Sequence, residues 1–186
     1  MSLVTVVATE YFLSVVTDGR EMRNGEVVGE QHPKCKQYSN VLVAYAGTKQ
    51  PAEIIISLLE KEGVLERGDL AEIATYVQHL FNAPELEKFK LLFAFGGLDA
   101  EGEITFHTID STHKILKKFT PKHGQISFAV LGNQDAANLF QLRLAQIEAG
   151  PSITEAQRIQ SEINEQVSKN AIGVNNTLFK FSIEKS

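Results

Sequence analysis

Two nearly unbroken apolar runs open the chain and constrain its fold more than any other feature. Residues 4–8 read VTVVA and residues 11–16 read YFLSVV, and both runs are rich in β-branched and aromatic side chains. A strand with one face in water alternates apolar and polar residues, whereas these runs hardly alternate. They therefore predict two strands that are covered on both faces, as in a sheet held between other layers.

The rest of the sequence predicts a fixed order of elements: strands, two helices, strands, two helices and a final strand. The further strands are expected at residues 34–38, 41–46, 88–95, 103–109, 114–119, 126–131 and 178–183. Apolar residues at three- and four-residue steps predict helices between Pro51 and Gly63, from Asp69 to Phe81, from Gly132 to Gly150, and from Ser152 to Val167. Asp69 and Ser152 are suited to cap the second and fourth of these helices.

This segregated order indicates an α+β fold, because parallel sheets need a crossover helix after nearly every strand. Two antiparallel sheets stacked face to face, each covered outside by a helix pair, would explain why several strands lack a polar face. That arrangement is a four-layer αββα sandwich, although composition alone does not distinguish it from other α+β packings. No linker-like stretch divides the chain, so we expect one domain over residues 1–186.

Composition excludes several classes of function. The net charge of −5 argues against general attraction to phosphate backbones, so nucleic acid is not an expected partner. The longest apolar runs fall short of the roughly 20 residues that span a bilayer, so no membrane segment is predicted. A single cysteine excludes an internal disulfide and no signal-peptide pattern is found, which favours a cytoplasmic protein.

Motifs near the start of the chain carry a resemblance to a known family. They are the N-terminal strand, Thr17-Asp18-Gly19-Arg20 after the second apolar run, Pro33-Lys34-Cys35-Lys36, and Ala44-Tyr45-Ala46-Gly47. In this order they resemble the proteasome β-subunits and their bacterial relatives, which are N-terminal-nucleophile hydrolases. The resemblance implies the αββα sandwich, a peptide or small amide substrate, no cofactor, and a ring of identical subunits. It does not indicate whether an ATPase partner exists.

In that family the first residue of the mature chain is the nucleophile, and the spacing back from the Asp-Gly motif puts Ser2 in its place. A free α-amine has a pKa of roughly 8 and can accept the proton of its own residue's hydroxyl. Ser2 becomes the first residue if Met1 is removed; otherwise its nitrogen is an amide and cannot act as a base. Thr5 is a poorer candidate, because it lies too close to Asp18 in sequence and within the first strand.

The resemblance also assigns roles to Asp18, Lys34 and Gly47. Asp18 would hold a buried Lys34, whose charge lowers the proton affinity of the adjacent amine and hydroxyl. The Gly47 amide would stabilise the oxyanion of the tetrahedral intermediate. Each position also has a purely structural interpretation: an aspartate in a turn, a solvated lysine on an edge strand, and a glycine that ends a strand.

Two positions depart from the family pattern. The family places a serine in a Gly-Ser-Gly turn, where this chain has Gly132-Asn133-Gln134, and an Asp-x-x-Ser-Gly run, where this chain has Lys169-Asn170-Ala171-Ile172-Gly173. Asn133 could still form a hydrogen bond, but Asn170 cannot supply a negative charge. The departures favour a second hypothesis: a catalytically inactive relative that serves as a binding or assembly module.

The remaining candidates are weaker. Cys35 is expected to pack in the core, because no histidine lies near it in sequence. The five histidines lack the spacing of a metal site, so no metal is predicted. Gly96 and Gly97 are expected to form a bulge or bend at the end of a strand.

Overall fold

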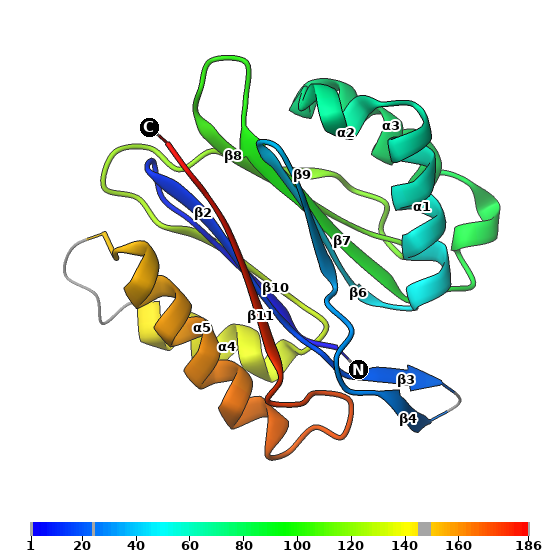
Figure 1. The fold of residues 1–186 in the computed structure, drawn as a ribbon, viewed down its shortest axis with the longest axis vertical. Coiled ribbons are helices and arrows are strands. Elements are labelled where there is room, and N and C mark those ends of the chain that lie inside the picture. Colours follow the sequence, from blue (N-terminus) through cyan, green and yellow to red (C-terminus); the bar gives the residue numbers. More distant parts are fainter. Residues whose placement is uncertain (1, 24, 145–149, 186) are drawn as a thin grey trace.

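The computed structural model describes residues 2–23, 25–144 and 150–185, and within these ranges it confirms an α+β fold with antiparallel sheets (Figure 1). The strands are β1 (Val4–Ala8), β2 (Phe12–Asp18), β3 (Glu21–Arg23), β4 (Glu26–Gly29), β5 (Cys35–Tyr38), β6 (Val41–Gly47), β7 (Leu91–Leu98), β8 (Ile104–Asp110), β9 (Lys117–Phe119), β10 (Ser127–Leu131) and β11 (Leu178–Glu184). The helices are α1 (Lys49–Lys61), α2 (Val64–Arg67), α3 (Leu70–Phe81), α4 (Gln134–Leu144) and α5 (Ile153–Ser168), with a 3₁₀ turn at Pro84–Leu86.

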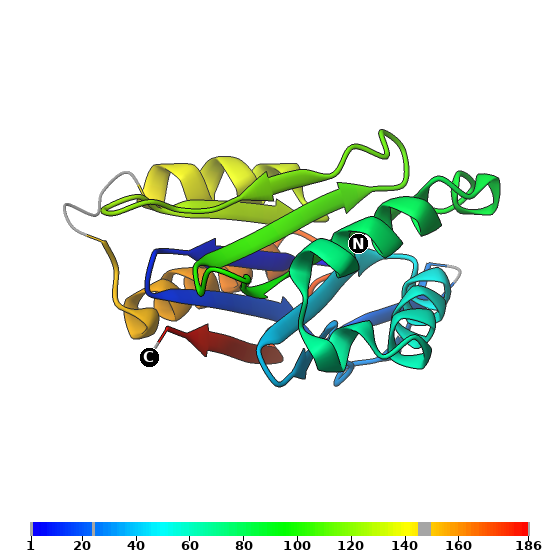
Figure 2. The same cartoon turned by 90° about the horizontal axis from the view of Figure 1, so that it is seen from above.

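Two larger sheets form the centre of the molecule. One has the strand order β10-β1-β2-β11 and the other the order β5-β6-β7-β8-β9, and every neighbouring pair is antiparallel. The helices α4 and α5 lie against the first sheet, whereas α1, α2 and α3 lie against the second (Figures 1 and 2). The strands β1 and β2 are central in their sheet, which places the start of the chain inside the molecule.

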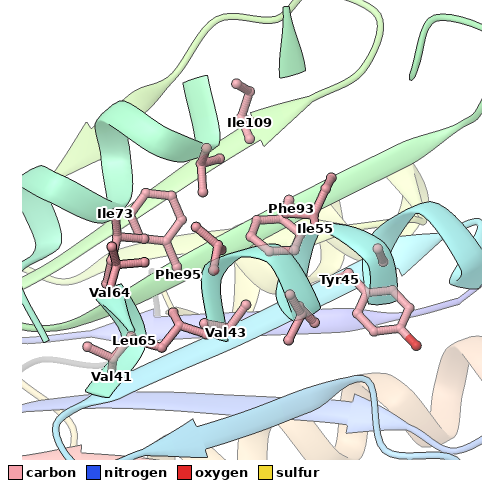
Figure 3. Close-up of a cluster of buried hydrophobic side chains, with 14 of the residues drawn as sticks. Val41, Val43, Tyr45, Ile55, Val64, Leu65, Ile73, Phe93, Phe95 and Ile109 are labelled. Carbon is pink, nitrogen blue, oxygen red and sulfur yellow. The ribbon is translucent and has the colours of Figure 1, made fainter. Parts of the chain in front are cut away.

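Three groups of buried apolar side chains fill the spaces between these elements. One group, including Val6, Leu13 and Phe106, lies between the two sheets. A second, including Phe93 and Ile73, lies between the larger sheet and the helices α1 to α3 (Figure 3). The third lies between the β1 sheet and the helices α4 and α5. Every residue of β1 and β2 is buried, as the unbroken apolar runs predicted.

The predicted helix ends are also found. The Asp69 carboxylate accepts hydrogen bonds from the backbone amides of Ala71 and Glu72, and the Ser152 hydroxyl accepts one from Glu155. Gly63 has a φ of 67° immediately after the last residues of α1, the left-handed conformation that commonly ends helices. The expected continuation of α4 over residues 145–147 lies outside the described residues.

Four details differ from the sequence prediction. The polar loop after β2 contains a hairpin, β3 and β4, and the short helix α2 was not expected. The strand predicted over residues 114–119 is limited to β9, because only residues 117–119 pair with β8, and Lys114 has a left-handed φ of 57°. Gly96 and Gly97 form no bulge, because the register of β7 with β6 and β8 runs through both without a shift. They are needed because side chains there would overlap Phe106 and the Asn40 carbonyl.

Candidate active site

The pairing of β1 with β2 brings the start of the chain beside the Asp-Gly motif. Val4 lies opposite Thr17 in this pair, so Leu3 and Asp18 lie just beyond it. The Asp18 amide donates to the Leu3 carbonyl at 3.1 Å, and the Leu3 amide donates to the Asp18 carboxylate at 2.8 Å. The bond from the Leu3 amide fixes one Asp18 carboxylate oxygen beside Leu3, which directly follows Ser2. Ser2 is therefore held close to Asp18 by backbone geometry.

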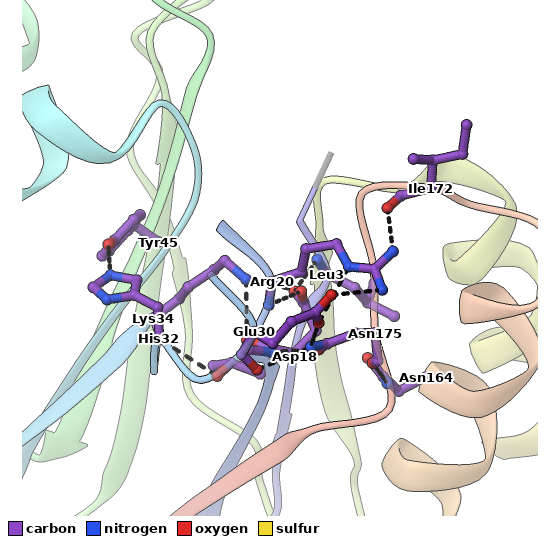
Figure 4. Close-up of polar contacts among 12 residues, drawn as sticks. Leu3, Asp18, Arg20, Glu30, His32, Lys34, Tyr45, Asn164, Ile172 and Asn175 are labelled. Atoms are coloured by element: carbon purple, nitrogen blue, oxygen red, sulfur yellow. Dashed lines mark hydrogen bonds and ion pairs between the residues drawn. The ribbon is translucent and has the colours of Figure 1, made fainter. Parts of the chain in front are cut away.

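Asp18 and Lys34 form the buried ion pair that the sequence predicted. The Lys34 ammonium lies 2.8 Å from the Asp18 carboxylate and donates to the Asp18 carbonyl at 3.0 Å (Figure 4). Asp18 has no exposed surface and Lys34 is only 3% exposed, which excludes the solvated-lysine interpretation. Burial lowers the pKa of Lys34, while the adjacent Asp18 carboxylate opposes that shift. The pair is therefore a fixed charge arrangement inside the protein.

Ser2, Lys34 and Gly47 line one pocket of about 260 Å³. The pocket lies at the ends of β1 and β6, and Arg20, His32 and Tyr45 also contribute to its wall. Ser2 is 7% exposed, so its hydroxyl lies at the edge of the core rather than in open solvent. Three of the six predicted site residues thus share one cavity, and Asp18 lies directly behind Lys34.

Gly47 in the pocket wall and Gly132 beside Ser2 permit close backbone approaches. Gly47 has a φ of 102°, and a Cβ there would overlap the Lys90 carbonyl oxygen. Gly132 has a φ of 101°, and a Cβ there would overlap the Ser2 carbonyl oxygen. Both positions therefore require glycine. Gly47 is exposed at the end of β6, where its backbone borders the cavity, so it both ends a strand and lines the site.

Asn133 and Asn170 do not reach this pocket. The Asn133 side chain accepts a hydrogen bond from the Ala136 amide at 2.9 Å, which is the contact of a helix cap at the start of α4. Asn170 is exposed just beyond α5, where its amide donates to the Val167 carbonyl. Neither residue lines the cavity, and only Asn133 uses its side chain in a helix cap.

A hydrogen-bond network that the sequence analysis missed supports the ion pair from the other end of the chain. The Arg20 amide donates to the second Asp18 carboxylate oxygen at 2.9 Å, and the Arg20 guanidinium binds Glu30 and the Ile172 carbonyl (Figure 4). The Asn175 side chain accepts from the Gly19 amide at 2.9 Å and donates to Glu30.

Asn164 on α5 completes this network by donating to the Asn175 carbonyl at 2.7 Å. Asn164 and Asn175 are both almost fully buried. No local motif marks either of them, because their partners lie up to 156 residues away in sequence. Only the buried polar character of these positions, which a sequence does not display, could have singled them out.

His32 and Tyr45 form a second polar contact in the pocket wall. The His32 Nε2 atom lies 2.8 Å from the Tyr45 hydroxyl, and Lys49 on α1 pairs with Glu21 at 2.9 Å nearby. Burial lowers the pKa of His32 and raises that of the Tyr45 hydroxyl. Both groups are therefore favoured in their neutral forms, and this part of the wall is polar without adding net charge.

Cys35 lies in the core between the sheets, as predicted, and burial raises the pKa of its thiol. Among residues 2–23, 25–144 and 150–185, no group of three or more histidine, cysteine, aspartate or glutamate side chains is arranged to hold a metal ion. No helix in the same ranges has the length and apolar character required to cross a membrane.

Comparison with solved structures defines the class of fold: it is that of the proteasome β-subunit-like proteins. The chain is similar to eukaryotic HslV from Trypanosoma brucei, with a TM-score of 0.73 over 98% of this chain and 99% of the other, at 15% identity. It is also similar to a Gly-1 mutant of Anbu from Hyphomicrobium sp. strain MC1, with a TM-score of 0.79, 15% identity, and 99% and 82% coverage.

Anbu, the ancestral β-subunit, from Yersinia bercovieri gives a TM-score of 0.75 at 13% identity, with 97% and 80% coverage. No family model matches the sequence, and no curated protein matches it. The predicted resemblance is thus confirmed at the level of the fold.

Proposed function

We propose that this protein is an N-terminal-nucleophile hydrolase of peptide or small amide bonds, with Ser2 as the nucleophile. The observation that carries the proposal is the pocket that combines Ser2, Lys34 and the exposed Gly47 backbone, with Asp18 paired to Lys34 behind its wall. We interpret the two sheets and their outer helices as the four-layer αββα sandwich of such enzymes. The single domain would act in the cytoplasm, as a ring of identical subunits, without a cofactor.

In the proposed reaction, removal of Met1 leaves Ser2 with a free α-amine. The Ser2 hydroxyl oxygen attacks the substrate carbonyl carbon while its proton passes to that amine. The Lys34 cation disfavours a protonated amine beside it, and so keeps the amine able to accept the proton at neutral pH.

The carbonyl oxygen then becomes an oxyanion, which the Gly47 amide stabilises without reorganisation. When the carbon–nitrogen bond breaks, the α-ammonium returns the proton to the leaving amine. Water then attacks the resulting Ser2 ester in a second cycle of the same proton transfers, releasing the acid and restoring the hydroxyl.

The test is covalent labelling at the N-terminus. Untagged protein is treated with a β-lactone directed at N-terminal nucleophiles, and the adduct is mapped by mass spectrometry together with the state of Met1. We expect one adduct on Ser2 of chains lacking Met1, and none in Ser2→Ala. Retention of Met1, or a processed chain with neither an adduct nor amide hydrolysis, would overturn the proposal.

The second candidate function is a catalytically inactive binding or assembly module. Asn133 and Asn170 favour it, because Asn133 caps a helix, Asn170 is exposed beyond α5, and neither lines the pocket or brings a charge to it. This candidate predicts a defined oligomer with no hydrolysis of any acyl substrate. Turnover that disappears in Ser2→Ala would exclude it.

A further inference from the structure

A second pocket, of about 480 Å³, adjoins the pocket that holds Ser2. It lies at the start of β7 and the end of β8, and its wall includes Leu91, Leu92 and the segment 110–113. Its volume falls in the range of roughly 300–1,000 Å³ that is typical of small-molecule sites, whereas the first pocket alone is smaller. Gly47 and Lys90 line both pockets.

The two pockets meet at Gly47 and Lys90, and Ser2 lines the first of them. The divide between them consists of backbone, because Gly47 and Lys90 approach so closely that no side chain fits between them, and the Thr48 amide donates to the Lys90 carbonyl at 2.9 Å. Gly132, in the wall of the second pocket, packs against the Ser2 carbonyl oxygen. A carbonyl group held at Ser2 and Gly47 would therefore have one pocket on each side.

The side chains of Asp110 and Ser111 in the wall of the second pocket already have hydrogen-bond partners in the protein. The Asp110 carboxylate accepts from the amides of Thr112 and His113 at 2.9 and 2.7 Å. The Ser111 hydroxyl donates to the Phe89 carbonyl at 2.6 Å and accepts from the Leu91 amide at 3.1 Å. An apolar guest would thus bury no unpaired polar group of this set, which is the condition for favourable burial.

The first pocket has a different character. Its wall includes Arg20, Glu21, His32, Lys34 and Lys49, so ionisable side chains surround most of it. The second pocket has fewer ionisable residues, namely Lys90, Asp110 and His113, of which the last two bind each other, and it adds Leu91 and Leu92. The two pockets therefore present different walls to the two ends of a substrate.

We propose that the second pocket binds an apolar group of the substrate, on the opposite side of the scissile bond from the group that occupies the first pocket. This assignment rests on the proposed hydrolase function, and it defines the substrate as an amide with an apolar group next to one side of the bond. Thr112 is the residue best placed to control the pocket, because it is exposed and lines it from the segment after β8.

The experiment uses four matched peptides that differ only in carrying Leu or Gly on each side of the cleaved bond. For the intact protein, we expect Leu on one side to raise kcat/KM by roughly tenfold or more over Gly, as filling an apolar pocket does. In Thr112→Trp, which fills the pocket, that preference should vanish, while the preference on the other side is kept. Thr75→Trp, on the exposed face of α3, is the control and should keep both preferences. Unchanged preferences in Thr112→Trp would overturn the proposal.

A second measurement separates this inference from the proposed activity. If Ser2 forms no adduct and no peptide is cleaved, the hydrolase function fails, but occupancy of the pocket can still be measured by NMR titration of the full chain with N-acetyl-leucine amide. Shifts at the amides of Gly47, Ser111 and Gly132 that disappear in Thr112→Trp and persist in Thr75→Trp would support an apolar site. No shift at these amides, or shifts unaffected by Thr112→Trp, would overturn it.

Discussion

The buried pair of Asp18 and Lys34 should dominate the local energetics, and a double-mutant cycle measures this directly. The two charged groups lie 2.8 Å apart with almost no exposed surface. Breaking a buried pair by removing one partner typically costs about 3–5 kcal/mol, because the other charge is left without compensation. We therefore expect Asp18→Asn and Lys34→Met each to lower the free energy of unfolding by about 3 kcal/mol or more.

The double variant should recover part of this loss, since it leaves no buried charge. Asparagine at position 18 keeps an oxygen that can accept from the Leu3 amide, which limits the damage to the backbone contacts. We expect a coupling energy of about 2–3 kcal/mol, at the upper end of values for contacting residues. The exposed pair of Lys185 and Glu103, 2.7 Å apart, is the control, and exposed pairs generally couple by less than about 1 kcal/mol.

Urea unfolding followed by circular dichroism gives the free energies of unfolding of the four proteins in each cycle.

The pH dependence of the free energy of unfolding adds an independent check on Asp18→Asn. Burial already lowers the pKa of Lys34, and losing Asp18 removes the group that opposes this shift. The unfolded chain then binds more protons than the folded one, so the destabilisation should shrink as the pH rises. A coupling energy below about 0.5 kcal/mol would refute the reasoning, because the two substitutions would then be independent.

Two further predictions concern single residues. His107 is buried, and its Nδ1 atom has no hydrogen-bond partner among the residues that the structure describes. Burial, with a smaller contribution from the charge of Lys118, lowers its pKa to about 4. The stabilisation that comes from keeping His107 neutral should be complete above about pH 6.5, the pKa of histidine in the unfolded chain. As the pH falls toward 4, this stabilisation should be lost, which lowers the free energy of unfolding by about 3 kcal/mol in total. His107→Phe, measured by urea unfolding at each pH, should lack this slope, and an equally steep fall in the variant would exclude His107 as its source. Gly132→Ala should cost about 1–3 kcal/mol and slow labelling of Ser2, since the new methyl group meets the Ser2 carbonyl oxygen. Gly124→Ala is the control: its φ is 71° with open space around it, so a comparable loss there would contradict the steric explanation.

The fold could be predicted where local patterns decide the structure. Residues 4–8 and 12–16 are apolar because both faces of β1 and β2 are covered, and that cause is visible in the sequence itself. Tyr11, which the prediction placed in the second strand, lies just before β2 and is 61% exposed. The β3–β4 hairpin was missed for the opposite reason. Val27 and Val28 are exposed on a two-stranded sheet outside the core. A strand that buries no face has no apolar pattern from which it could be predicted.

The glycine pair in β7 shows a second limit of sequence patterns. A glycine in a strand signals either a bulge or a close approach by another group, and the two are indistinguishable without the partner. At Gly97 the partner is the carbonyl of Asn40. Asn40 directly precedes β6, the strand that pairs with β7, and it is far from Gly97 in sequence. The same limit applies to the site. Asp18 and Lys34 were predicted from the resemblance that short motifs carry, whereas the partners of Asn175 are identified only in the folded chain.

That last strand ties the candidate site to the completed fold. β2 lies between β1 and β11, so Asp18 is flanked by Leu3 on one side and by Leu178, opposite it in the register, on the other. Asn175 then binds the Gly19 amide across 156 residues of sequence. Contacts of such separation carry a loop-closure entropy, which must be offset by the interactions that they make. The Asp18–Lys34 arrangement therefore depends on both ends of the chain, and a chain whose last strand is not docked would lack the geometry that the proposed chemistry requires.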